Sequence, residues 1–234
     1  MGTECVLNPS SPSPFFFLLM ILKAAVREGD ARKLAELIRQ DRRLDVNNQE
    51  GYFGSTALHS ACVESHRSPV IPLLLAHPKI NVNLKDNGDQ TPFFWACREG
   101  RTSCVREMLK DSRVNVKTPD NEGRTRLRFA AYYGHLDVIK WWIASEREMD
   151  LGTPGDVDYT DAIGVAMNRG KTEVVAPLER FKENPVETRH AMRMELGWYD
   201  DLAFEMFAIP KRNVDLYQVL MWLYFGCNVV IQWY

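Results

Sequence analysis

Gly164 and the triplet Gly170-Lys171-Thr172 form the segment most suggestive of chemistry, because glycines before a Lys-Thr pair can cradle a phosphate. Five residues separate the two glycines, whereas a phosphate loop has four between them, and no β-strand is expected before the segment. Gly100-Arg101 and Gly134-His135 occupy the corresponding place earlier in the chain. A turn between two helices accounts for the segment, so the sequence argues against nucleotide binding.

The histidines and cysteines do not form a site either. None of the five histidines lies at metal-ligand spacing, and the five cysteines contain no CxxC pair. No serine or cysteine stands in a recognisable nucleophile context. The sequence therefore predicts no catalytic residue, no cofactor and no metal. An odd number of cysteines without a dense framework indicates reduced thiols, and hence a cytoplasmic or nuclear protein.

The net charge of the chain limits the classes of partner that it would attract. The net charge is −2, with 29 basic and 31 acidic residues, so no global field attracts nucleic acid or a membrane surface. One local basic run breaks this balance and is formed by Arg113, Lys117, Arg124, Arg126 and Arg128. Such a run is usually a solvated face, but it would also suit an acidic partner or nucleic acid.

The clearest organising feature is self-similarity at a period of 34 to 36 residues. Alanines recur at Ala25, Ala61, Ala96, Ala130 and Ala166, which are 36, 35, 34 and 36 residues apart. Four residues after each of them comes a turn residue: Gly29, Ser65, Gly100, Gly134 and Gly170. These landmarks stay in register along the chain, which indicates a repeat architecture.

One unit shows what the repeat must build. Thr91 is a good N-cap, and Pro92 stands at the first helical position, where its missing N–H is not needed. Gly100 ends this short helix, and a second helix follows with Cys104, Val105, Met108 and Leu109 on one face. No single unit can bury its apolar face alone, so the units are expected to stack.

These residues closely resemble the ankyrin-repeat family. The resemblance is carried by Thr91-Pro92, by Thr56-x-Leu58-His59-x-Ala61, by Gly134-His135-x-x-Val138-Ile139 and by Val82-Asn83. It implies an all-α solenoid of stacked antiparallel helix pairs joined by β-hairpin finger loops. It also implies protein binding on a concave face. Arg126 and Arg128 depart from the pattern, because proline and histidine are typical at their positions.

The repeats are expected over residues 20–181, as four to five units of which the first and last are degenerate. Residues 1–19 would form an N-terminal extension, residues 182–209 a helical cap or an independent helical module, and residues 210–234 an apolar tail. Pro72 and Pro177 fall inside expected second helices, which we predict to be bent or frayed there.

The expected binding surface combines two sets of positions: those that flank each alanine landmark, on the concave face, and the tips of the finger loops. Tyrosine, tryptophan and arginine are the residue types that dominate interface energetics. The candidate contacts are Tyr52, Phe53, Asp86, Asn87, Trp95, Arg98, Glu99, Asp120, Glu122, Tyr132, Tyr133 and Arg169. Tyr132 and Tyr133 are adjacent, so at most one of them is expected to point inward.

The sequence thus predicts a monomeric, non-catalytic adaptor or scaffold that binds a protein. A nucleic-acid or acidic-partner binder that uses the basic run is one alternative, and an enzyme with an accessory repeat domain ranks last. A further alternative is a membrane tail anchor at Leu216–Tyr234, a run of 19 residues without a charge.

Overall fold

The computed structural model describes residues 14–41, 44–49, 51–117, 119–120, 122–152 and 161–198. The chain divides into two compact units, Met1–Met192 and Arg193–Tyr234, and the repeats lie in the first. The end of the expected helical segment 182–209, from residue 199 on, and the apolar tail 210–234 lie outside the described residues, as does most of the second unit.

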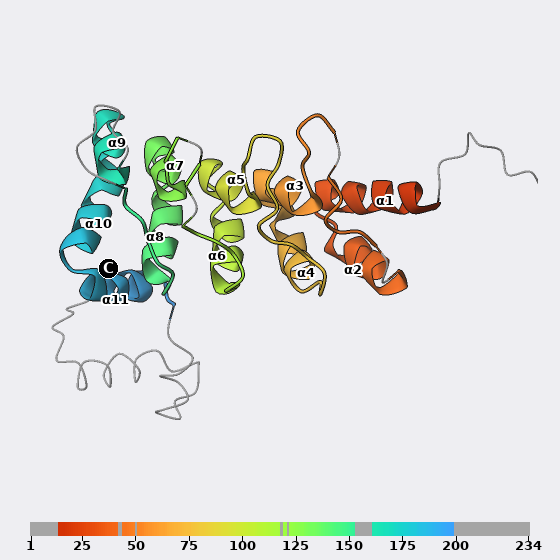
Figure 1. The fold of residues 1–234 in the computed structure, drawn as a ribbon. Coiled ribbons are helices and arrows are strands. Elements are labelled where there is room, and N and C mark those ends of the chain that lie inside the picture. The colour runs from red at the N-terminus through yellow and green to blue at the C-terminus, as the bar shows by residue number, and fades with distance from the viewer. Residues whose placement is uncertain are drawn as a thin grey trace, which may run out of the picture. The chain divides into compact units, whose positions relative to one another are not determined.

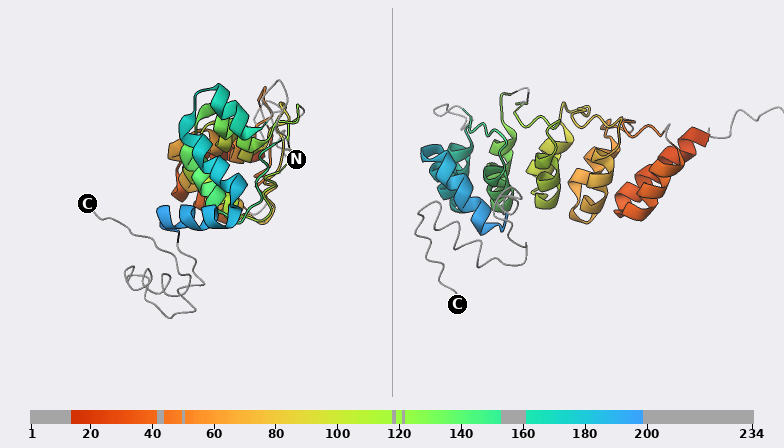
Figure 2. Two further views of the ribbon diagram at one scale, coloured as in Figure 1. Left: turned by 90° about the vertical axis from the view of Figure 1, so that its left-hand side faces the viewer. Right: turned by 90° about the horizontal axis from the view of Figure 1, so that it is seen from below.

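The first unit is a row of helix pairs in two layers (Figure 1). Figure 2 shows the pairs side by side, with the connecting loops on one side of the row. The first helices of the pairs are α1 (Pro14–Glu28), α3 (Ala57–Val63), α5 (Pro92–Arg98), α7 (Arg126–Tyr133) and α9 (Ala162–Asn168). The second helices are α2 (Ala31–Gln40), α4 (Ile71–Leu75), α6 (Thr102–Lys110), α8 (Leu136–Ala144) and α10 (Thr172–Glu183). Helix α1 begins six residues before residue 20, where the repeats were expected to start.

The first helices begin at the caps that the repeat predicts. The side chains of Thr56, Thr91, Thr125 and Asp161 each accept a hydrogen bond from the backbone N–H three residues later. After the repeats, Asn184 caps α11 (Pro185–Glu195), where it accepts from the backbone N–H of Glu187 and donates to the Glu187 carboxylate. A capped helix therefore follows the last repeat within the segment 182–209.

The landmark alanines lie where the layers approach most closely, and all five have 0% exposed surface. In four pairs the alanine carbonyl accepts from the N–H five residues later, as in Arg101 N to Ala96 O at 2.9 Å. The intervening glycine then needs a positive φ, which is 67° at Gly100 and 66° at Gly170. The predicted inter-helix turns are confirmed, and the phosphate-loop-like segment is one of them.

The two prolines have different effects. Near Pro72 the second helix is divided into a 3-10 helix, η1 (Ser65–Val70), and the short α4, as expected. At Pro177 the helix is not interrupted, because α10 continues through it from Thr172 to Glu183. A proline removes only its own N–H, and the buried side chains of Val174, Leu178 and Phe181 hold this helix against the stack.

The finger loops are tight turns, and the described residues contain no β-strand. In the second finger, residues 86–90, the N–H of Asp86 donates to the Gln90 carbonyl at 2.9 Å. The Asp86 carboxylate accepts from the N–H groups of Gly88 and Gln90. A side chain thus satisfies the N–H groups inside the turn, and the fingers are loops without a strand ladder in this all-α fold.

Neighbouring repeats are tied by a hydrogen bond that recurs along the stack. In three repeats the side chain that follows the inter-helix turn donates to a carbonyl two residues past the alanine of the preceding pair. His135 Nε2 donates to Arg98 O at 2.8 Å, Arg101 Nε to Val63 O at 2.6 Å, and His66 Nε2 to Arg27 O at 2.9 Å. These three turns are therefore each tied to the preceding repeat.

Candidate protein-binding surface

The side chains one residue before each alanine landmark lie beneath the fingers. The Trp95 indole donates to Asp86 Oδ2 of the second finger at 2.8 Å. In the third finger, the loop that precedes α7, Arg124 lies over the Phe129 ring at 5.2 Å. We call the surface between the first helices and the fingers the inner face. It corresponds to the concave face expected from the sequence.

A row of aromatic rings and arginines follows this inner face. Arg98 lies 4.9 Å above the Trp95 ring, and Arg169 lies 4.1 Å above the Tyr132 ring. Tyr133 meets Tyr132 edge to face at 4.9 Å. It is 42% exposed and stacks on His135 in the inter-helix turn. The two rings thus touch each other, with Tyr132 under Arg169 and Tyr133 the more exposed of the two.

Several predicted contacts are used within the fold. Asp86 is only 8% exposed, and three internal donors occupy its carboxylate, so it cannot be a surface contact. Asp120 has the same role in the third finger, where it accepts from the N–H groups of Glu122 and Arg124. Hydrogen bonds, from Arg124 above all, hold the pKa of the Asp120 carboxyl below its ordinary value, although burial alone would raise it. Glu122 and Glu99 pair with Arg124 and Arg98 at the surface.

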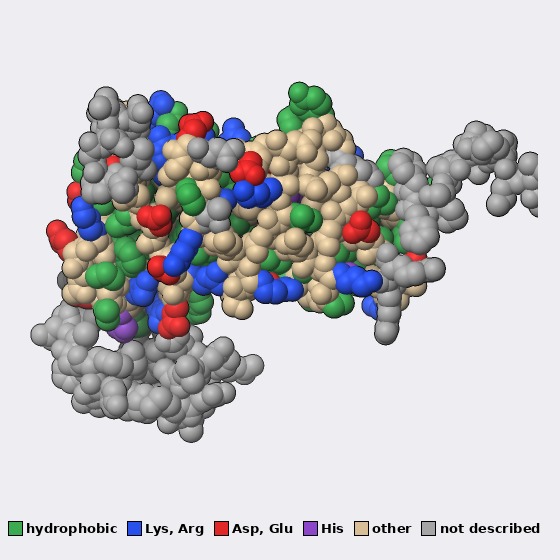
Figure 3. Space-filling view, viewed as in Figure 1, with side chains coloured by type: hydrophobic (Ala, Val, Ile, Leu, Met, Phe, Trp, Pro, Cys, Tyr) green, Lys and Arg blue, Asp and Glu red, His purple; other side chains and the backbone are tan. Residues whose placement is uncertain are grey.

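Among the large apolar side chains that the structure describes, Tyr52 at the tip of the first finger is the most exposed. Tyr52 and Phe53 are 89% and 70% exposed, and their rings meet edge to face at 5.3 Å. Figure 3 shows hydrophobic side chains projecting above the loop that precedes α3. Asn87 fixes this tip by donating from its backbone N–H to Phe53 O and from its side chain to Tyr52 O.

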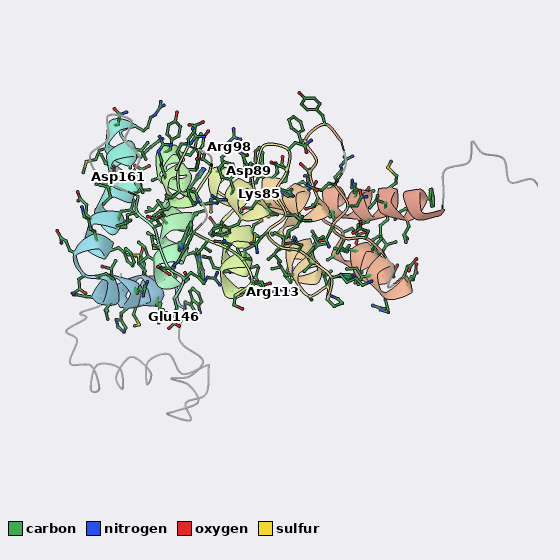
Figure 4. All side chains as sticks on the ribbon, in the orientation of Figure 1. Lys85, Asp89, Arg98, Arg113, Glu146 and Asp161 are labelled. Carbon is green, nitrogen blue, oxygen red and sulfur yellow. The ribbon has the colours of Figure 1, made fainter. Side chains whose placement is uncertain are left out.

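The basic run does not form a basic surface, which corrects that expectation. Arg113 pairs with Asp111 at 2.6 Å, Lys117 pairs with Glu148, and Arg124 pairs with Asp120 at 2.7 Å. Arg126 is 1% exposed, because stacking of the fourth pair on the third encloses it. Figure 4 places Arg113 at the lower ends of the second helices, far from Arg98 at the finger side.

The described residues offer no site for metal or thiol chemistry. They contain no cluster of histidine, cysteine or acidic residues that could hold a metal ion. Cys62, Cys97 and Cys104 are free and buried in the core. Burial raises the pKa of the Cys104 thiol to about 11 and also raises the pKa of the other two, so none is a reactive thiolate at neutral pH. Among the described helices, none has the length and apolar character needed to span a membrane.

Comparison with known proteins identifies the family. The model for ankyrin repeats (three copies) matches residues 21–120 and 68–155, which together cover more than half of the chain. The chain therefore belongs to the ankyrin-repeat family. Its repeats make it a protein–protein interaction module, and members of this family are typically non-catalytic.

Three relatives illustrate the similarity. The chain is similar to the SMC5-SMC6 complex localization factor protein 1 of Homo sapiens, with 39% identity over 164 residues, and of Bos taurus, with 30% over 158 residues. Both matches cover 68% of this chain and 15% of the relative. The chain is also similar to a probable E3 ubiquitin-protein ligase, XBOS31, of Oryza sativa subsp. japonica. That match has 34% identity over 117 residues and covers 50% of this chain and 25% of the ligase. The chain thus spans only a small part of the length of these relatives.

Proposed function

We propose that the chain is an adaptor that binds a protein through the inner face and the finger tips. The observation that carries the proposal is the row of aromatic and arginine side chains over α5, α7 and α9. Trp95, Arg98 and Tyr132 are partly exposed and Arg169 is exposed, so each of the two ring–arginine pairs is accessible to a partner. Tryptophan, tyrosine and arginine are the residues that most often dominate binding energy in protein interfaces.

This surface is held in place before any partner arrives. The Trp95 indole is oriented by Asp86, and Asp86 is itself fixed by the backbone of the second finger. A preformed surface loses little conformational entropy on binding, so more of the contact energy appears as affinity. The fold therefore suits the recognition of a folded surface or a peptide better than it suits catalysis.

The relatives support the same class of role. Two of them are named as localization factors of a protein complex. By analogy, we propose that this chain brings its partner to a place or an assembly, acting as a monomer in the cytoplasm or nucleus. The buried free thiols in the described part of the chain are compatible with a reducing compartment. Membrane attachment through Leu216–Tyr234 would be tested by deleting that segment and fractionating cells.

A pair of substitutions tests the inner face. We expect Arg98→Ala combined with Arg169→Ala to weaken partner binding by more than about 1 kcal/mol, because both guanidinium groups and their ring contacts are lost. Proteins captured from a cell extract by the full chain would be identified by mass spectrometry and their affinities measured by calorimetry. Lys182→Ala on the exposed side of α10 is the matched control. Equal affinities for all three proteins would contradict the assignment.

A further inference from the structure

A groove of about 380 Å³ lies between α1 and the first finger, at the N-terminal end of the inner face. One wall is a single face of α1, where Met20, Lys23, Ala24 and Arg27 follow the i, i+3, i+4, i+7 spacing. The other wall is the finger, with the aromatic pair Tyr52 and Phe53, and Ser60 of α3 also lines the groove. The groove is thus bounded by a helix face and an aromatic tip.

The side chains of the aromatic tip lie outside the core. Val46 and Thr56 are ten residues apart, whereas Val82 and Thr91 are nine apart, so the first finger is one residue longer than the second. Counted back from the capping threonine, Tyr52 and Phe53 stand where the second finger has the polar turn residues Asn87 and Gly88. They are 89% and 70% exposed and bury no core. Exposed apolar groups gathered in this way mark interaction sites.

The tip is also rigid, which a surface for binding requires. Gln49 Nε2 donates to Gly54 O at 2.8 Å and to Lys85 O at 2.7 Å, which links the first finger to the second. Asn87 holds the carbonyls of both aromatic residues. Tyr52 and Phe53 are therefore presented on a braced loop, and a ligand does not need to order them.

The charges that line the groove indicate which kind of ligand it would bind. Among the described lining residues the two charged ones, Lys23 and Arg27, are both cations, one helical turn apart. Arg67 adds positive charge beside them, because its Nε donates to Arg27 O at 3.1 Å and its Nη1 to Ser60 O at 3.0 Å. A cationic wall that faces exposed aromatic rings favours a ligand with carboxylates beside a large apolar side chain.

We propose that this groove binds an acidic peptide segment of a partner protein. An apolar anchor side chain of that segment would lie against Tyr52, Phe53 and Met20, while flanking aspartate or glutamate residues would pair with the cations of α1. The inference rests on the proposed protein-binding function and names the chemistry of the partner. It places an anchor point at the N-terminal end of the inner face, separate from the row of rings over α5 to α9.

Selection from a random peptide library displayed on phage, with the full chain as bait, tests the proposal. We expect the selected sequences to combine a phenylalanine, tryptophan or leucine with neighbouring acidic residues. Synthetic versions should bind in fluorescence anisotropy, and their affinity should fall as salt rises. Arg27→Glu, and Tyr52→Ser combined with Phe53→Ser, should each weaken binding at least about tenfold. Lys182→Glu is the matched charge-reversal control, and circular dichroism would confirm that every variant is folded.

Several outcomes would overturn the inference. Selection of neutral or basic peptides, or of no peptide, contradicts an acidic ligand. Acidic peptides that bind the groove variants normally also contradict it. Peptides that bind the groove variants normally but are lost on Arg98→Ala combined with Arg169→Ala would overturn the groove assignment while supporting the proposed function. The two proposals can therefore fail independently.

Discussion

Arg126, the first residue of α7, carries a positive charge in the interior of the stack. It is 1% exposed, and its Nε and Nη1 have no hydrogen-bond partner. Burial lowers the pKa of its guanidinium, while the surrounding Cys97, Asp120 and Asp89 act in the opposite direction. The Phe94 ring centroid lies 6.0 Å away and contributes a further weak attraction. The polar contacts of this guanidinium stabilise it less than the loss of its hydration destabilises it.

Replacing this arginine with an apolar side chain of similar length should stabilise the protein. We expect Arg126→Met to raise the free energy of unfolding by about 1–3 kcal/mol, because a poorly satisfied buried charge is removed without leaving a large cavity. Urea denaturation followed by circular dichroism measures the change, with Lys182→Met as the exposed control. A loss of stability would show that Arg126 is better satisfied than its contacts indicate.

At the scale of the element, the inter-helix turn combines a backbone requirement with a packing requirement. Gly100 and Gly170 have nearly equal positive φ values, 67° and 66°. A Cβ at Gly100 would lie 2.5 Å from Nδ1 of His135 in the next repeat, whereas a Cβ at Gly170 would meet nothing within 4 Å. The two positions therefore separate the intrinsic cost of the turn from the cost of disturbing the neighbouring repeat.

Alanine substitution at these two glycines should have unequal effects. Gly170→Ala should destabilise by about 1 kcal/mol, which is the cost of a left-handed backbone for a residue with a Cβ. Gly100→Ala should cost roughly 2–4 kcal/mol, because the methyl group also displaces the His135 ring from its bond to Arg98 O. Thermal unfolding of both variants under the same conditions provides the comparison. Equal losses of stability in the two variants would mean that the His135 ring moves aside without an energetic cost.

The turns, the caps and the buried alanines could be predicted from the sequence because each depends on a few neighbouring residues that recur at one period. The burial of Arg126 and Asp86 could not, since it depends on how one repeat covers the next. The finger groove was missed for a similar reason. Tyr52 and Phe53 were recognised as candidates, but the cations that face them come from α1, more than twenty residues earlier. A search for cations repeating every four residues on α1 would have offered a partial signal.

At the scale of the whole molecule, the repeats form a quasi-linear array in which each pair packs on its neighbours. Stability is then a sum of repeat terms and interface terms, and cooperativity depends on every interface. Ala96 has 0% exposed surface and lies in the central pair, where the side chain must be small. This position controls whether the two ends of the array unfold together.

Ala96→Asp should uncouple the two halves. A carboxylate in this contact costs several kcal/mol, on the order of 3 or more, because burial strips the charge of its water. We expect urea unfolding to show a lower midpoint and a shallower or two-step transition. Met167→Asp, at a residue that is 53% exposed, is the control and should retain a single steep transition. An unchanged midpoint and slope for Ala96→Asp would argue against a quasi-linear array.

The bracing of the first finger also has a mechanical consequence. A partner that pulls on Tyr52 and Phe53 loads the carbonyls that Asn87 holds, and so transfers force to the second finger. From there Asp86 passes the load to the Trp95 indole on α5. The tip therefore moves less under load than a loop that is held only by its own two ends.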